Sequence, residues 1–135
     1  MAQAQTAAEP TEPLAILNAV DTDLNEFKWI KRPVVIFADS EFDPAFVEQM
    51  ELIVSEADRL VERDVVVITD TDPDARSEIR LRMRPRGFML TLVGKDGQLK
   101  IRKPFPQDVR EITASIDKMP MRQREIREAK EAARN

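Results

Sequence analysis

Residues 87–102 read Gly-Phe-Met-Leu-Thr-Leu-Val-Gly-Lys-Asp-Gly-Gln-Leu-Lys-Ile-Arg, a pattern typical of two strands joined by a tight turn. The apolar run Phe88–Val93 is short and predicts a buried strand. Asp96-Gly97 supplies the positive backbone φ that a short hairpin loop needs. Residues 98–102 then alternate polar and apolar side chains, as an edge strand does. The stretch therefore predicts an antiparallel hairpin whose second strand lies at the edge of a sheet.

Two apolar segments upstream predict parallel strands at the centre of the same sheet. Pro33–Ala38 and Val65–Ile68 are short and continuously apolar, which is typical of strands buried on both faces. Between them, Asp43-Pro44 predicts a helix start, because the carboxylate accepts free backbone N–H groups and proline has none to satisfy. Apolar residues at spacings of three and four then predict one long helix: Phe46, Met50, Ile53, Val54, Ala57, Leu60 and Val61.

Further helices are expected after the second strand and after the hairpin. Asp72-Pro73 repeats the helix-start signal and leads into a helix from Ala75 to about Met83. Pro106 to about Lys118 carries its apolar residues on one side and predicts another helix. The order β-α-β-α-β-β-α resembles a thioredoxin-like α/β fold, with a four-stranded mixed sheet flanked by helices.

The chain divides into three predicted parts. Residues 1–24 lack periodicity and predict a flexible N-terminal segment, although Leu14–Val20 is apolar enough to dock on the domain edge. Residues 25–120 are the thioredoxin-like domain. Residues 121–135 predict a charged helical tail that projects into solvent, with ion pairs three or four residues apart: Arg122/Glu125, Arg124/Glu128 and Arg127/Glu131.

The composition limits the chemistry that this chain can perform. It has 135 residues, enough for one domain with a core, and no cysteine, histidine or tyrosine. Thiol exchange is therefore impossible, because the thiolate is the nucleophile, and a Ser-His-acid triad is impossible too. Zinc is disfavoured because its sites use Cys and His. We expect no catalytic residue, no cofactor and no metal.

Charge and hydropathy limit the partners. The formal net charge of −4 gives no reason to expect nucleic acid, since proteins that bind it carry a basic footprint. No apolar run approaches the roughly 18 residues that a membrane span needs. Three glycines also leave no room for a glycine-rich phosphate loop.

Several motifs in register make the chain similar to a known family, the domain of unknown function 4174. The resemblance covers roughly residues 25–127. It rests on Phe27–Arg32 followed by Val35–Ala38, Gly87-Phe88, Leu92–Gly97, Lys100, Arg102, Ile116-Asp117, and Met119-Pro120-Met121-Arg122 through Glu125.

The resemblance implies a fold and a location more than an activity. Domains of this family occur in small exported bacterial proteins, and related ones in vertebrate secreted sushi-repeat proteins and a coiled-coil matrix protein. The family is regarded as thioredoxin- or peroxiredoxin-like, with no established role. Ala2-Gln3-Ala4 fits the small-x-small pattern beside a signal-peptide cleavage site, so we expect a periplasmic or secreted protein. The alternative is an ordinary disordered leader in the cytoplasm.

The resemblance also locates where redox cysteines would lie, after the first central strand and at the start of the next helix. A helix N-terminus there lowers a thiol pKa. This chain instead has Asp39, Glu41 and Asp43, of which Asp43 is the expected helix cap. Thioredoxins also place a cis-proline directly before the third central strand. Arg86 and Gly87 separate Pro85 from that strand, so we do not predict it to be cis.

Three weaker candidates have ordinary structural interpretations. Ser40 is a turn residue rather than a nucleophile. Asp70, Asp72 and Asp74 have the alternate spacing of a calcium loop, but the required later glycine and glutamate are missing and Asp72 is better used as a cap. Phe27 and Trp29 are expected to cover the core, the alternative being a platform for a ligand.

The densest basic cluster is the best candidate for binding. Arg76 and Arg80 have acidic neighbours and predict a salt-bridged helix face. Arg82, Arg84 and Arg86 have none, and forked guanidinium groups suit the oxyanions of a polysaccharide or phosphate. Hairpin cations extend this possible anion or partner site: Lys95, Lys100 and Arg102. Lysine on an edge strand also serves to block edge-to-edge pairing.

We therefore expect an exported, non-catalytic binding or adaptor module that recognises a partner protein or an anionic polysaccharide surface. The alternative is a diverged peroxiredoxin-like oxidoreductase that lacks the redox cysteines.

Overall fold

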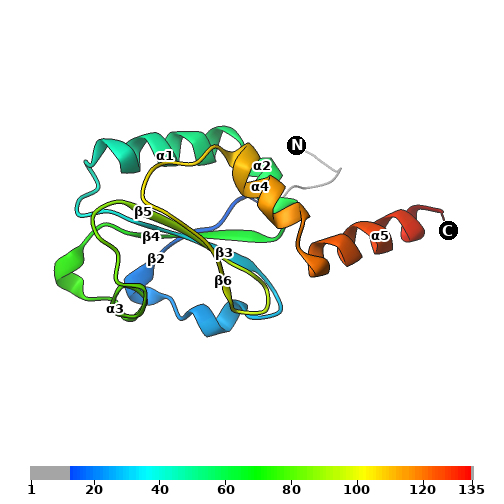
Figure 1. Ribbon diagram of the computed structural model, residues 1–135, viewed down its shortest axis with the longest axis horizontal. Coiled ribbons are helices and arrows are strands. Elements are labelled where there is room, and N and C mark those ends of the chain that lie inside the picture. Colours follow the sequence, from blue (N-terminus) through cyan, green and yellow to red (C-terminus); the bar gives the residue numbers. More distant parts are fainter. Residues whose placement is uncertain (1–12, 135) are drawn as a thin grey trace, which may run out of the picture.

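A computed structural model describes residues 13–134 as a mixed five-stranded sheet with helices on both faces (Figure 1). The strand order across the sheet is β2-β4-β3-β5-β6. β2, β4 and β3 are mutually parallel, and β5 and β6 run antiparallel to their neighbours. The strands are β2 Ile16–Asn18, β3 Arg32–Phe37, β4 Val65–Asp70, β5 Met89–Val93 and β6 Leu99–Lys103.

The fold is thioredoxin-like, and the predicted order of strands and helices is confirmed. The sheet has five strands where the sequence predicted four, because residues 16–18 pair in parallel with the edge of β4 that lies opposite β3. The Val67 N–H donates to the Ala15 carbonyl at 2.9 Å and extends that pairing. The fifth strand lies within residues 1–24, which were predicted to be flexible, and specifically in the apolar stretch Leu14–Val20 that was expected to dock on the domain edge. Residues 1–12, including Ala2-Gln3-Ala4, lie outside the described residues.

Alternating side chains of the central strands supply two hydrophobic cores. On one face, Val34 and Ile36 pack with apolar residues of the helices α1, α2 and α4. On the other, Val35 and Phe37 pack with α3 and with the 3-10 helices η1 and η2 (Figure 1). The helices are η1 Ala19–Asp21, η2 Leu24–Phe27, α1 Pro44–Ser55, α2 Ala57–Val61, η3 Pro73–Ala75, α3 Glu78–Met83, α4 Val109–Asp117 and α5 Pro120–Arg134.

Three predicted helices are shorter in the structure, and the one expected from Pro106 begins only at Val109. The long helix after β3 breaks at Glu56, whose φ of −127° and ψ of 30° separate α1 from α2. The helix expected from residue 75 begins only at Glu78, because Arg76 adopts a left-handed conformation and Ser77 caps α3. Asp43 caps α1 as predicted, accepting from the Ala45 N–H at 2.9 Å.

The tail predicted for residues 121–135 is the helix α5, which extends away from the sheet (Figure 1). Of its three predicted ion pairs, the described residues form only Arg122–Glu125, at 3.6 Å. None of the described helices is long and apolar enough to cross a membrane.

Candidate functional site

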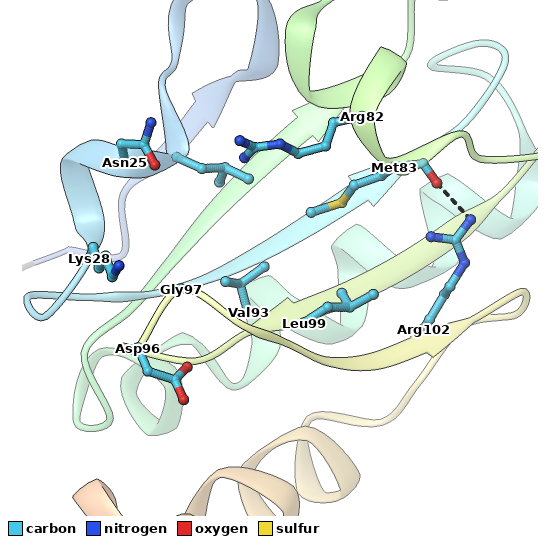
Figure 2. Close-up of a pocket in the computed structure, with 10 residues that line it drawn as sticks. Asn25, Lys28, Arg82, Met83, Val93, Asp96, Gly97, Leu99 and Arg102 are labelled. Carbon is cyan, nitrogen blue, oxygen red and sulfur yellow. Dashed lines mark hydrogen bonds between the residues drawn. The ribbon is translucent and has the colours of Figure 1, made fainter.

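A hollow of about 370 Å³ lies on the α3 side of the sheet, between η2, the end of α3 and the β5–β6 hairpin (Figure 2). Val93 and Leu99 supply apolar surface from the two hairpin strands. Leu24 and Asn25 come from η2, and Met83 from the end of α3. We call this hollow the hairpin pocket. It combines apolar walls with a polar opening, as ligand sites often do.

Cations outnumber carboxylates at the opening of the hairpin pocket. Arg82 points across it toward Asn25, and Lys28 and Arg102 lie at opposite ends of it (Figure 2). The one carboxylate, Asp96, accepts from the Lys100 ammonium at 2.9 Å. The Gln98 backbone N–H and then Lys100 hold the pKa of Asp96 below its usual value. The pocket therefore presents three cations against one carboxylate that already has a partner.

Arg102 is bonded to the backbone at the end of α3. Its Nη2 donates to the carbonyls of Met83 and Arg84, at 2.6 and 3.2 Å. These bonds fix β6 to the end of α3, where Arg84 adopts a left-handed conformation with a φ of 52°. A second hollow, of about 300 Å³, adjoins Arg102 and is lined also by Arg84 and Arg86. We call Arg82, Arg84, Arg86 and Arg102 the arginine face.

The predicted hairpin lysines point elsewhere. Lys95 is only 10% exposed in its side chain and donates to Asp64 and Glu125, each at 2.8 Å. Lys100 is paired with Asp96 and lines a different hollow beside Trp29. The structure thus brings together the four arginines of the predicted set and separates Lys95 from them, whereas Lys100 shares a groove beside β6 with Arg102 alone of the four.

Lys28 is a pocket residue that the sequence analysis missed. It belongs to the turn after η2 and lies close to Gly97, where an added Cβ would be 3.5 Å from the Lys28 Cδ. Lys28 and Gly97 are nearly seventy residues apart in the sequence. No local pattern could have indicated it. The neighbouring Trp29 was expected to cover the core, but it is 59% exposed, with Lys28 Nζ 5.6 Å from its ring centroid. Phe27 does pack on the core.

The segment after β3, where redox cysteines would lie, is an ordinary turn and helix cap. The Ser40 hydroxyl accepts from the Phe42 N–H at 3.0 Å, and Asp43 caps α1. Asp39 and Glu41 are exposed. The peptide bond before Pro85 is trans. This end of the sheet therefore uses its polar groups for local backbone bonds.

A buried polar cluster lies beside that turn, and its groups are bonded to one another. Asp70, at the end of β4, accepts from Arg80 at 2.9 and 3.1 Å and from the Ser77 hydroxyl at 2.5 Å. Arg80 also donates to the Ala38 carbonyl at 2.9 Å. The cluster fastens α3 to the ends of β3 and β4. Asp72 caps η3, and residues 13–134 contain no group of three or more Asp and Glu placed to hold a metal ion.

A second cluster of charges fastens α5 to the sheet. Arg32 has a fully buried side chain and donates to Glu125 at 3.1 and 3.3 Å and to the Arg63 carbonyl at 2.8 Å. Lys95 bridges Glu125 to Asp64. We call Arg32, Asp64, Lys95 and Glu125 the α5 anchor. Three of the segments that carry the family resemblance, 27–32, 92–97 and 119–125, meet here.

A family model matches the part of the chain that contains all three of these segments. A model described as Domain of unknown function (DUF4174) matches residues 23–125. The chain belongs to this family. The matched range begins at the N-cap of η2 and ends at Glu125, so it includes the hairpin pocket and the whole α5 anchor. No curated protein matches the chain.

Solved structures are similar to this DUF4174 domain in fold. A reduced 2-Cys peroxiredoxin from Plasmodium vivax is 13% identical with a TM-score of 0.60, covering 71% of this chain and 81% of its own. A reduced desulfothioredoxin from Desulfovibrio vulgaris Hildenborough is 16% identical with a TM-score of 0.56, covering 80% of this chain and 100% of its own. At such identities the likeness shows the fold alone.

Proposed function

We propose that this DUF4174 domain is a non-catalytic binding module that holds an anionic ligand at the arginine face and the hairpin pocket. The observation that carries the proposal is the gathering of Arg82 and Arg102 with Lys28 around a hollow that has apolar walls. In a chain with a net charge of −4, such a local excess of cations is a departure from the overall balance. A concave, positively lined surface attracts anions and raises their local concentration.

The chemistry of the arginines favours oxyanions. A guanidinium group is planar, always charged and able to donate two parallel hydrogen bonds to a sulfate, phosphate or carboxylate. Arg82, Arg84 and Arg86 are exposed and make no ion pair within the described residues. Their donors are therefore available to a ligand. The apolar surface of Val93 and Leu99 would contact the body of that ligand.

The alternative, a diverged oxidoreductase, has less support from the residues present. The chain has no thiol or imidazole to act as nucleophile or base. The hydroxyls of Ser40 and Ser77 are engaged with the Phe42 N–H and with Asp70. A binding role needs only the surface charges and hollows that the chain does contain.

We also propose that the protein works outside the cytoplasm, in a periplasm or as a secreted protein. The support is the family resemblance and the small-x-small residues Ala2-Gln3-Ala4. Fractionation of the source cells with an antibody against the protein is expected to recover it with an extracytoplasmic marker. Recovery with a cytoplasmic marker contradicts the proposal.

Retention on immobilised heparin, a sulfated polyanion, tests the binding role. The parent protein is expected to be retained at low salt. The triple variant Arg82→Ala/Arg84→Ala/Arg86→Ala is expected to bind about tenfold more weakly, because each exposed ion pair contributes a few tenths of a kcal/mol. Elution salt and a dissociation constant for a heparin oligosaccharide measure the change.

A matched control removes three cations from another surface. Arg124→Ala/Arg127→Ala/Lys130→Ala changes the net charge equally on α5, where these side chains are exposed. Its retention is expected to equal that of the parent protein. Equal weakening in both triple variants, or no retention of the parent protein, contradicts the proposed role.

A further inference from the structure

The strand β6 has an unpaired edge, and a groove that has not yet been described lies beside it. β6 is the last strand of the sheet, so its outer backbone N–H and C=O groups have no strand partner. All but one of its five residues are exposed. A groove of about 480 Å³ lies along it, between residues 100–103 and the helix α4. At about 3.4 Å per residue, residues 100–103 give the groove a length of roughly 10 Å.

The groove is positively charged and has an apolar base. Its cations are Lys100, Arg102, Lys103 and Lys118, against one carboxylate, Glu111. Ile101 and Ile112 line it as well, and both belong to the hydrophobic core on the α4 side. Within residues 13–134, the side-chain ammonium groups of Lys103 and Lys118 make no hydrogen bond or ion pair, although both residues lie in backbone-bonded elements. These two ammonium groups therefore lack a protein acceptor.

We propose that an extended acidic segment of a partner protein binds here by adding a strand to β6. The open edge favours a ligand in an extended conformation, since an added strand would form hydrogen bonds with the outer backbone groups of β6. The lysines specify acidic side chains, and the apolar base suits alternating apolar ones. Lys103 and Lys118 line this groove on the α4 side of the sheet, and only Arg102 lines both this groove and the hairpin pocket.

Charge also argues against a second copy of this chain as the occupant. Edge-to-edge pairing of two β6 strands would set Lys100, Arg102 and Lys103 against the same cations of the other copy. Like charges directly opposite each other in a sheet are destabilising. The same lysines that block self-association therefore favour an acidic strand.

The test is a titration of the ¹⁵N-labelled protein with a peptide of about six residues that alternates glutamate and valine. We expect shifts of the amide signals of β6 and of Lys118, together with slower hydrogen exchange on β6. A second peptide, N-methylated at every other residue, keeps the charges but loses the donors on one edge. It is expected to bind at least about tenfold more weakly, since several backbone hydrogen bonds are lost.

Matched charge reversals complete the test. Lys103→Glu/Lys118→Glu is expected to weaken binding about tenfold, whereas Arg127→Glu/Lys130→Glu, with the same change of net charge on α5, leaves it within about twofold. Equal binding of both peptides means charge attraction without strand addition and overturns the proposal. So does an absence of binding, or a dimer by sedimentation whose interface is β6. The Arg82/Arg84/Arg86 triple variant should still bind the peptide, so the outcome is independent of the heparin result.

Discussion

The variant Glu125→Ala is expected to lower the free energy of unfolding by about 3 kcal/mol, because it leaves the buried Arg32 guanidinium without a carboxylate and Lys95 with Asp64 alone. Arg32 is fully buried in its side chain and Lys95 is only 10% exposed. Both donate to Glu125, which lies on α5 and is 26% exposed in its side chain. Urea-induced unfolding followed by circular dichroism measures the loss.

The control is Glu128→Ala, on the same helix and fully outside the α5 anchor. Glu128 is exposed and makes no ion pair among the described residues. Its replacement is expected to change stability by less than about 0.5 kcal/mol. Equal losses of stability in the two variants would mean that replacing any glutamate of α5 destabilises the protein, and would contradict a specific role of the α5 anchor.

The effect of Glu125 should depend on pH in a definite direction. Partial burial raises the pKa of Glu125, but the bonds from Lys95 and Arg32 outweigh it, so the pKa lies below its usual value. A carboxyl with a lowered pKa in the folded state stabilises the protein above its unfolded pKa, and this contribution is lost as pH falls through the folded value. The difference between parent and Glu125→Ala is therefore constant near neutral pH and shrinks below about pH 4. A difference that persists unchanged at pH 3 contradicts the ion-pair explanation.

The variant Asp70→Ala should cost a similar amount, about 3 kcal/mol or more, at the opposite end of the molecule. Asp70 is 1% exposed in its side chain and is the carboxylate partner of Arg80. Its removal leaves the Arg80 guanidinium, 11% exposed, with only backbone carbonyl acceptors. The Ser77 hydroxyl loses its acceptor as well. Equilibrium unfolding in guanidinium chloride measures the change.

A double variant separates the charge effect from a simple loss of side-chain volume. Asp70→Ala/Arg80→Met removes both charges, and it should be more stable than Asp70→Ala alone because no unpaired cation remains. Asp74→Ala, at an exposed carboxylate nearby, is the control and should change stability by less than about 0.5 kcal/mol. If the double variant is less stable than Asp70→Ala, the Asp70–Arg80 pair is not the source of the loss.

The central strands of this fold were predictable because their burial is visible in the local sequence pattern. β3 and β4 are buried on both faces, and their continuous β-branched runs indicate this directly. β2 could not be predicted in the same way. It has three residues, and Ile16 and Leu17 remain 45% and 37% exposed, so no burial pattern is present. The break at Glu56 was also missed, because the apolar spacing runs on through it.

The candidate site was predictable only where it is local in sequence. Arg82, Arg84 and Arg86 alternate within a few residues, so their gathering required only a short loop. The strand predicted from the sequence began at Pro33, yet Arg32 is the first residue of β3 and its side chain is fully buried. Its partner Glu125 is 93 residues away, and no local pattern connects the two. Buried charge pairs of this kind depend on tertiary contacts that a periodicity argument does not contain.

The most direct test of the proposed function is to map where an anion binds. The side-chain Nε–Hε signals of all arginines can be followed by NMR while a short heparin oligosaccharide is added. The largest shifts are predicted for Arg82, Arg84, Arg86 and Arg102, with saturation at a single dissociation constant. Shifts that are largest at Arg124 and Arg127 on α5, or that grow evenly over all arginines without saturating, would contradict binding at the arginine face.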